Sequence, residues 1–179
     1  MIGGFRIAAK IRDKYDVDAG SYDSLYRNEQ ISKLNGLIDA GWLPADRLID
    51  IGCGTGLIAC RIARRCDFAV GMDISLNMIR QGRRRKMVEY VVGDALHPPF
   101  RSECFTQGIC ITSFHHFPYK TYALVRMAEI IVRGGNLVVS LRQNLDEEAS
   151  EAALLSCPAL RLTEQIKAGK EILFLFARV

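Results

Sequence analysis

The order of strands and helices expected from residue 46 onward limits the fold of this 179-residue chain most strongly. Short runs rich in β-branched residues alternate there with stretches in which apolar residues recur every three or four positions. Such alternation is typical of a parallel sheet covered by helices. We expect five successive βα units, with strands at 47–51, 68–73, 88–92, 108–112 and 135–141 and helices at 57–65, 76–85 and 119–132.

The end and the beginning of the chain depart from this alternation. Two strand-like runs, 159–166 and 171–179, are separated by four residues, and so short a connection joins only antiparallel strands. The sheet should therefore have seven strands and close with a hairpin at one edge. Before the sheet, 24–40 should be a helix that ends at Gly41 and buries Leu25, Ile31, Leu34 and Leu37.

Composition and length set the outer limits. Hydrophobic residues make up 49% and charged residues 25%, as in an ordinary globular protein. We expect one domain, with 1–45 as an N-terminal helical lid or substrate segment and 46–179 as a cofactor-binding sheet. The net charge of +4 permits an RNA substrate without indicating one, and no DNA is expected. Six cysteines without a C-x-x-C pair and the lack of a membrane-spanning stretch predict a cytoplasmic protein with free thiols and no membrane contact.

A glycine-rich turn follows the first expected strand. The segment DIGCGTG at 50–56 lets the backbone approach a ligand closely, and the helix after it offers free N–H groups. The stretch GTGLIA at 54–59 also satisfies the G-x-G-x-x-A form of the dinucleotide fingerprint. No lysine follows the glycines, which excludes the phosphate loop of nucleotide hydrolases. A NAD(P)-dependent or flavin enzyme stays an alternative at this point.

Three acids distinguish between the possible ligands. Asp50, Asp73 and Asp94 each fall at the carboxyl end of one of three consecutive strands, where open α/β sheets bind ligands. Asp73 suits the ribose of any adenosine ligand. Asp50 stands beside the glycine turn, where it would repel a pyrophosphate. A cationic ligand without phosphate suits the position better, and S-adenosylmethionine combines an ammonium, a sulfonium, a ribose diol and an adenine amine.

These motifs resemble those of the class I (Rossmann-like) S-adenosylmethionine-dependent methyltransferases, in particular the methyltransferase type 11 group. DIGCGTG resembles the first motif, GMDIS at 71–75 followed by Met78 resembles the second, and GDA at 93–95 resembles the third. The similarity extends from about Leu48 to Leu141. It implies a doubly wound, mostly parallel seven-stranded sheet with a C-terminal antiparallel hairpin, and an enzyme that transfers a methyl group from S-adenosylmethionine.

The resemblance also implies roles for single residues. The glycines of the turn would bracket the methionine moiety, Asp73 would hold the ribose, Ile74 and Met78 would pack on the adenine, and Asp94 with Ala95 would hold the adenine edge. Tyr22 is expected to cover the methionine end. The predicted cofactor-binding set is Tyr22, Asp50, Gly52, Cys53, Gly54, Gly56, Asp73, Ile74, Met78, Gly93, Asp94, Ala95 and Cys110.

No particular catalytic residue is required, because a sulfonium methyl group needs only an aligned nucleophile and the exclusion of water. Candidates are Tyr22 and two histidines after the fourth strand, His115 and His116, which can accept a proton from a hydroxyl or an amine. The alternative is that one histidine caps the following helix while the other packs beneath the loop. No metal site is expected, since adjacent histidines lack further ligands nearby.

The methyl acceptor is not determined by these patterns. A small molecule and a tRNA or rRNA both stay open, and basic residues of the N-terminal segment (Arg6, Lys10, Arg12 and Lys14) are candidates for contacting phosphate. Arginine clusters at 61–65 and 80–86 fall at helix C-termini, which point away from the ligand edge of a parallel sheet. A small partner subunit that brings a larger acceptor, or a non-catalytic S-adenosylmethionine-binding subunit of a partner complex, is the second hypothesis.

Overall fold

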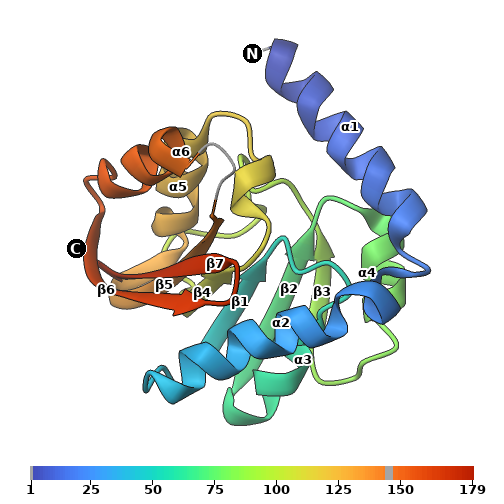
Figure 1. The fold of residues 1–179 in the computed structure, drawn as a ribbon, viewed down its shortest axis with the longest axis horizontal. Helices are drawn as coiled ribbons and strands as arrows, with labels where there is room; N and C mark the ends of the chain where they lie inside the picture. Colours follow the sequence, from blue (N-terminus) through green and yellow to red (C-terminus); the bar gives the residue numbers. More distant parts are fainter. Residues whose placement is uncertain (1, 144–146) are drawn as a thin grey trace.

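The computed structural model describes residues 2–143 and 147–179 (Figure 1). Its strands form a seven-stranded sheet in the order β3-β2-β1-β4-β5-β7-β6. Strands β1 to β5 are parallel, whereas β7 pairs antiparallel with β5 and with β6. The predicted mostly parallel sheet with a C-terminal hairpin is thereby confirmed. The bounds are β1 (Arg47–Ile51), β2 (Phe68–Asp73), β3 (Glu89–Val92), β4 (Phe105–Cys110), β5 (Ile131–Arg142), β6 (Leu160–Ala168) and β7 (Glu171–Arg178).

The predicted strand bounds are correct for β1 and β2 and wrong for β4 and β5. Strand β4 ends at Cys110 instead of residue 112, because Thr112 has a left-handed backbone with φ of 62° that an extended strand does not allow. Strand β5 begins at Ile131 instead of residue 135. Ile131 already pairs with Phe105, and the register then shifts before Gln107. The earlier end of β4 changes where the chain leaves the sheet beside the ligand edge, whereas the start of β5 lies at the opposite edge.

Helices cover both faces of the sheet, as a doubly wound fold requires (Figure 1). One apolar core contains Leu37, Ile58 and Ile79, and the other contains Leu124 and Leu154. The helices of the first face are α2 (Tyr22–Asp39), α3 (Leu57–Ile62) and α4 (Leu76–Gly82), and those of the second are α5 (Lys120–Glu129) and α6 (Glu147–Leu155). This leaves the carboxyl edge of the sheet to be covered by α1 (Ile2–Asp18), which packs against α4.

The connections correct three predictions about helices. Residues 93–104 lead from β3 to β4 through turns and an isolated Asp94–His97 bridge, so no helix follows β3 and the five predicted βα units become four. Helix α6, which follows β5, was not predicted. The predicted helices 57–65, 76–85 and 119–132 are too long, because the α-helices end at Ile62, Gly82 and Glu129.

Helix α2 buries a stripe that differs from the predicted one. Leu25 is 67% exposed, because at about 100° per residue it lies on the face opposite Leu34. Leu34 and Leu37 are buried as predicted, and Ile31 is half-buried. The stripe is completed by two polar side chains, Gln30 and Lys33, which hydrophobic periodicity does not detect.

Candidate functional site

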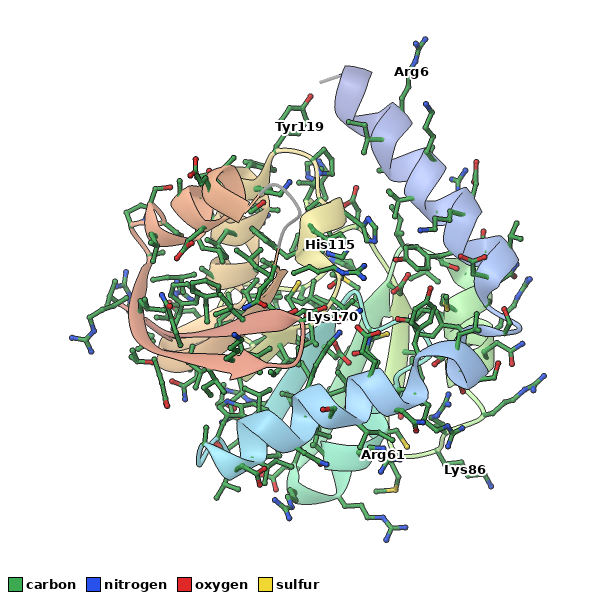
Figure 2. All side chains as sticks on the ribbon, in the orientation of Figure 1. Arg6, Arg61, Lys86, His115, Tyr119 and Lys170 are labelled. Atoms are coloured by element: carbon green, nitrogen blue, oxygen red, sulfur yellow. The ribbon has the colours of Figure 1, made fainter. Side chains whose placement is uncertain are left out.

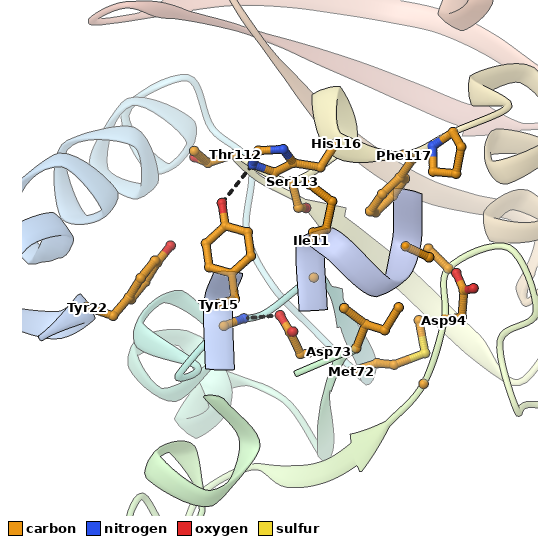
Figure 3. A pocket seen from close by; sticks show the side chains of 17 residues that line it. Ile11, Tyr15, Tyr22, Met72, Asp73, Asp94, Thr112, Ser113, His116 and Phe117 are labelled. Atoms are coloured by element: carbon orange, nitrogen blue, oxygen red, sulfur yellow. Dashed lines mark hydrogen bonds between the residues drawn. The ribbon is translucent and has the colours of Figure 1, made fainter. Parts of the chain in front are cut away.

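A cavity lies at the carboxyl ends of β1, β2 and β4, beneath α1 (Figure 3). It encloses about 670 Å³, part of it continuous with solvent. Residues of α1 (Ala8, Ile11 and Tyr15), Met72 and the segment after β4 (Thr112, Ser113, Phe117 and Pro118) supply part of its wall. The predicted site residues that line it are Tyr22, Gly52, Gly54, Asp73, Ile74, Gly93, Asp94, Ala95 and His116.

The glycine turn has a backbone that other residues rarely adopt. Gly52, Gly54 and Gly56 have φ of 72°, 56° and 72°, all in the left-handed region. A Cβ atom on Gly52 would lie 2.5 Å from Cβ of Ser113, and one on Gly54 would lie 3.4 Å from the Tyr22 ring. Gly56 instead faces Tyr90. The first two glycines therefore keep space at the cavity, and the third permits packing behind it.

Asp73 is held at the end of β2 by two backbone amides. Its Oδ2 accepts from Gly54 N at 2.7 Å (Figure 3), and its Oδ1 accepts from Ser75 N at 2.8 Å. Burial raises its pKa in spite of these bonds. Because each carboxylate oxygen can accept more than one hydrogen bond, the fixed carboxylate can still receive both hydroxyls of a ribose. Asp94 is oriented similarly, since its Oδ1 accepts from Leu96 N at 2.9 Å.

Asp50 lies outside this cavity and lines a smaller one beside it, together with Tyr22, Gly52 and Cys53. It is 3% exposed. Burial, followed by repulsion from Asp73, raises the pKa of Asp50 to about 7. A carboxylate so far from its usual range is stabilised by a nearby positive charge.

Tyr15 of α1 and His116 of the segment after β4 meet in the cavity wall (Figure 3). Oη of Tyr15 lies 2.7 Å from Nε2 of His116. Burial raises the pKa of Tyr15 to about 12, and burial together with His115 lowers the pKa of His116 to about 4. Both groups are then neutral at pH 7, and the tautomer of His116 sets which of the two donates the hydrogen bond. The helix-capping alternative for the histidines is wrong, because Tyr119 is the N-cap of α5 and has no side-chain capping bond.

Helix α1 is anchored beside this pair. Asp16 Oδ1 accepts from Ser75 Oγ at 2.5 Å and from Asn77 N at 3.0 Å, which ties the end of α1 to the start of α4. Sequence reasoning missed the α1 side of the cavity. The sequence feature that indicates this wall is the spacing of Ala8, Ile11 and Tyr15, which places them on one face of a helix.

Four predicted residues do not line either cavity: Gly56, Met78, Cys110 and His115. Met78 and Cys110 are fully buried. Cys110 Sγ lies 3.1 Å from Oγ of Ser113, a wall residue, and the ring of His115 packs at a tilt against His116, with ring centroids 3.9 Å apart. They stand one layer behind the wall, and their contact with a cofactor stays a prediction.

The basic residues lie away from the cavity wall. Arg61 and Lys86 are at the end of the molecule opposite His115, and Arg6 projects from the outer side of α1 (Figure 2). Arg85 also lies outside the cavity wall, but it contacts the glycine turn: it pairs with Asp23 and donates to Thr55 O at 2.7 Å. It supports the glycine turn from behind.

Within residues 2–143 and 147–179, no three His, Cys, Asp or Glu side chains are grouped as a metal ion would require. Over the same ranges, no helix is long and apolar enough to cross a membrane.

Comparison with known proteins decides the family. The model of the methyltransferase domain family matches residues 49–139, which contain the glycine turn and all three acids. The chain belongs to this family. The predicted membership of the S-adenosylmethionine-dependent methyltransferases is thereby confirmed, and S-adenosylmethionine is the cofactor of this methyltransferase family. The comparisons give no support to an oxidoreductase.

Similar curated proteins are longer than the matched part. Demethylmenaquinone methyltransferase of Corynebacterium kroppenstedtii is 28% identical over 138 residues, which are 75% of this methyltransferase chain and 57% of the relative. 27-O-demethylrifamycin SV methyltransferase of Amycolatopsis mediterranei is 32% identical over 111 residues, or 56% of this chain and 41% of the relative. The chain thus spans about half the length of these relatives.

Solved structures share the fold over nearly the whole chain. Magnesium protoporphyrin IX methyltransferase of Synechocystis, with bound S-adenosylmethionine, has a TM-score of 0.76 at 16% identity and covers 97% of each chain. A chain from the complex between the Haloferax volcanii Trm112 methyltransferase activator and a methyltransferase has a TM-score of 0.77 at 16% identity, with 92% and 97% covered. These likenesses support the class I methyltransferase fold.

Proposed function

We propose that this protein transfers the methyl group of S-adenosylmethionine to a small, uncharged and largely apolar acceptor. The observation that carries the proposal is the pairing of a fixed acid with a glycine turn at one sheet edge. Asp73 is oriented by the amide of Gly54, so the group that suits a ribose is bonded directly to the turn that approaches the ligand. Asp94 and Ala95 line the same cavity at the end expected to hold the adenine.

The wall opposite these acids favours an uncharged acceptor. Among the residues described, none that lines the cavity is a lysine or an arginine. Ala8, Ile11, Phe117 and Pro118 give that part of the wall an apolar character. Two relatives support a small acceptor by their names, which refer to demethylmenaquinone and to 27-O-demethylrifamycin SV.

For methyl transfer, the protein mainly has to place the methyl donor and the acceptor in line. S-adenosylmethionine supplies a methyl group on a positively charged sulfur, which departs with the electrons of the broken C–S bond. The acceptor atom forms the new bond to carbon and gives up its proton. Residues of α1 and of the loop after β4 would hold the acceptor in line and exclude water. Among the catalytic candidates, His116 and Tyr22 line the cavity. Nε2 of His116 is bonded to Tyr15, and burial lowers its pKa to about 4, so this imidazole is a weak base and the proton of the acceptor is released to solvent.

Binding tests the first step. Titration calorimetry should show that S-adenosylmethionine binds and that NAD binds far more weakly, and tighter binding of NAD would overturn the proposal. Asp73→Ala should weaken binding by roughly 1.5 to 3 kcal/mol, the range for hydrogen bonds to a charged group. An unchanged affinity would show that Asp73 does not touch the ligand.

Labelling tests the acceptor. The protein is incubated with methyl-labelled S-adenosylmethionine and a cell extract separated into RNA, protein and small-molecule fractions. We expect label in the small-molecule fraction. Label in RNA would contradict the acceptor class and would favour a phosphate contact by the exposed Arg6, Lys10, Arg12 and Lys14 of α1.

A second candidate is a subunit that acts only with a partner, either as the catalytic chain or as a non-catalytic cofactor-binding chain. The similarity to a chain found in complex with the Trm112 activator favours it. Cofactor binding without label transfer by the purified chain, followed by transfer after adding back extract protein, would support this candidate over the first.

A further inference from the structure

Tyr22 is a side chain that the two cavities share. It lines the large cavity beneath α1 (Figure 3) and also the smaller cavity beside Asp50. Its ring lies 3.4 Å from the position that a Cβ atom would take on Gly54. Because Tyr22 is the first residue of α2, its place in both walls depends on what holds the start of that helix.

The apolar core does not hold the start of α2. Residues 22–29 include no buried side chain. The buried residues of this helix all come later and are Gln30, Lys33, Leu34 and Leu37. Ser21, at the N-cap, makes no side-chain capping bond. The first two turns of α2 therefore depend on polar contacts for their position, whereas the second half of the helix is fixed by buried side chains.

A set of polar contacts, the Arg85 bridge (Asp23, Thr55 and Arg85), attaches this segment to the glycine turn. Thr55 Oγ1 donates to Asp23 Oδ1, and Arg85 pairs with Asp23 Oδ2. The same guanidinium donates from Nη1 to the carbonyl oxygen of Thr55 at 2.7 Å. Thr55 is 1% exposed and stands between Gly54 and Gly56. The bridge thus joins α2, the glycine turn and the loop after α4.

Arg85 reaches Thr55 because the end of α4 comes close to the turn. A Cβ atom on Gly82, the last residue of α4, would lie 3.0 Å from the carbonyl oxygen of Thr55. The chain then turns, since Arg85 N donates to Gly82 O at 2.8 Å. A planar guanidinium donates two hydrogen bonds in a fixed geometry, which suits a carboxylate and a carbonyl side by side. Its neighbours Arg84 and Lys86 are exposed, so Arg85 alone in this basic loop contacts the turn.

Building on the proposed function, we infer that Arg85 and Asp23 are positioning residues for cofactor binding, because the Arg85 bridge fixes Tyr22 over the glycine turn and so sets the wall that the two cavities share. Neither charged residue lines a cavity. Their effect on a ligand passes through Tyr22, which is next to Asp23 in the chain and contacts the site.

The glycine turn itself is held independently of the bridge. Gly54 N donates to Asp73 Oδ2 at 2.7 Å, and Gly56 N donates to Cys53 O at 2.8 Å. Loss of the bridge should therefore release Tyr22 and the start of α2, and leave the turn in place. The expected result is weaker binding of the cofactor in a chain whose sheet stays intact.

Titration calorimetry with S-adenosylhomocysteine tests the inference without an acceptor. Arg85→Met keeps the apolar stem and removes both bonds, so it should weaken binding by about tenfold. Arg85→Lys keeps a charge beside Asp23 without the planar fork, and its affinity should fall between those of Arg85→Met and the wild type. Arg178→Met is the matched control, since Arg178 also pairs with a carboxylate, that of Glu103, and donates to the carbonyl oxygen of Glu129 at 3.2 Å. It should leave the affinity unchanged.

A double-mutant cycle decides whether the effect passes through Tyr22. Tyr22→Leu removes the aromatic ring from the shared wall. In this background, Arg85→Met should change the affinity for S-adenosylhomocysteine by less than about twofold. Equal weakening in both backgrounds would overturn the inference, because Arg85 would then act on the glycine turn itself.

Hydrogen exchange separates positioning from general support of the fold. Arg85→Met should speed exchange of the amides of residues 25–29 and leave those of 34–39, β1 and β2 unchanged. Faster exchange throughout the sheet, or no change at 25–29, would overturn the inference, since the bridge would then support the whole fold or hold nothing. If S-adenosylhomocysteine fails to bind the wild type, the proposed function fails, and the exchange result still decides what the bridge holds.

Discussion

Two buried polar clusters adjoin at Thr112, which bonds to Lys33 in one and to Gln30 in the other, and they differ in how completely their charges are paired. In the Lys33 cluster (Lys33, Thr112 and Glu171), the ammonium lies 2.7 Å from the carboxylate of Glu171 and 2.7 Å from Oγ1 of Thr112. In the Asp50 cluster (Gln30, Asp50 and Asp73), Asp73 adds repulsion to the buried Asp50, and Oε1 of Gln30 has no hydrogen-bond partner among the described residues. The first cluster is complete within the chain, and the second is not.

This difference distinguishes charges that support the fold, in the Lys33 cluster, from charges that suit a ligand, in the Asp50 cluster. The Lys33 cluster joins α2, the end of β4 and the start of β7, so it fixes the wall that α2 forms. The Asp50 cluster destabilises the ligand-free protein, because desolvation and mutual repulsion raise the pKa of Asp50 to about 7. A cationic ligand would relieve that cost. The polar groups of both clusters are buried, yet the paired charges of the Lys33 cluster are compatible with the ligand-free fold and the Asp50 carboxylate destabilises it.

The largest expected effect comes from opening the complete cluster. Lys33→Met leaves the carboxylate of Glu171, which is 1% exposed, buried without its cation. Breaking a buried pair on one side typically costs about 3 to 5 kcal/mol. Urea unfolding should show a loss of that size in the free energy of unfolding.

A double substitution is the control for this prediction. Lys33→Met combined with Glu171→Leu removes both charges, and replacing a buried pair by apolar residues is often neutral. The double variant should recover more than half of the stability lost by Lys33→Met. A single variant as stable as the wild type would mean that the pair is not buried in solution.

The incomplete cluster should respond in the opposite direction. Asp50→Asn removes the repulsion with Asp73 and keeps an acceptor for the Ala59 amide, so it should stabilise the ligand-free protein at pH 8. The gain should be on the order of 2 kcal/mol, since one pKa unit corresponds to about 1.4 kcal/mol. Calorimetry should show weaker binding of S-adenosylhomocysteine at the same pH.

The pH dependence follows from the sign of the shift. Asp50 has a folded pKa near 7, above its ordinary value, so the folded chain holds a proton that the unfolded chain releases between about pH 4 and 7. The contribution of Asp50 to stability is therefore largest in acid and falls as pH rises through that window. The advantage of Asp50→Asn over the wild type should be near zero at pH 4 and greatest at pH 8. A constant difference across this range would contradict the raised pKa.

The same contrast explains how far sequence alone could lead. The succession of strands along the chain and the positions of Asp50 and Asp73 at strand ends follow from short-range patterns, because β-branched runs and glycine turns act locally. The register of β5 and the left-handed Thr112 were missed, since both depend on pairing between segments far apart in the chain. Helix α6 was missed because no strong apolar period indicates it.

At the site, the residues of the glycine motifs could be predicted and their neighbours could not. Gln30 and Lys33 look like solvent-facing residues of an amphipathic helix, yet both are buried. Their burial is possible only because Glu171, more than a hundred residues away, arrives at the same point. Tyr15 has its partner His116 at a similar separation. Polar groups that find partners across the fold leave no periodic signal.

The smallest expected effect concerns the third polar contact at this edge, between Tyr15 and His116. Their rings are only half-buried. The hydrogen bond between these two neutral groups helps to attach α1, which the bond between Asp16 and Ser75 also ties to the start of α4. Tyr15→Phe removes the hydrogen bond to Nε2 of His116 and should cost about 0.5 to 1.5 kcal/mol. That cost should appear as faster hydrogen exchange of the α1 amides, with little change in the β1 and β4 amides. Tyr26→Phe, at a side chain that is 40% exposed, is the matched control and should leave exchange in α1 unchanged. Equal acceleration in α1 and the sheet would show that Tyr15 supports the whole fold. Helix α1 would then unfold only together with the sheet, like the elements that the Lys33 cluster joins, and would not open separately over the cavity.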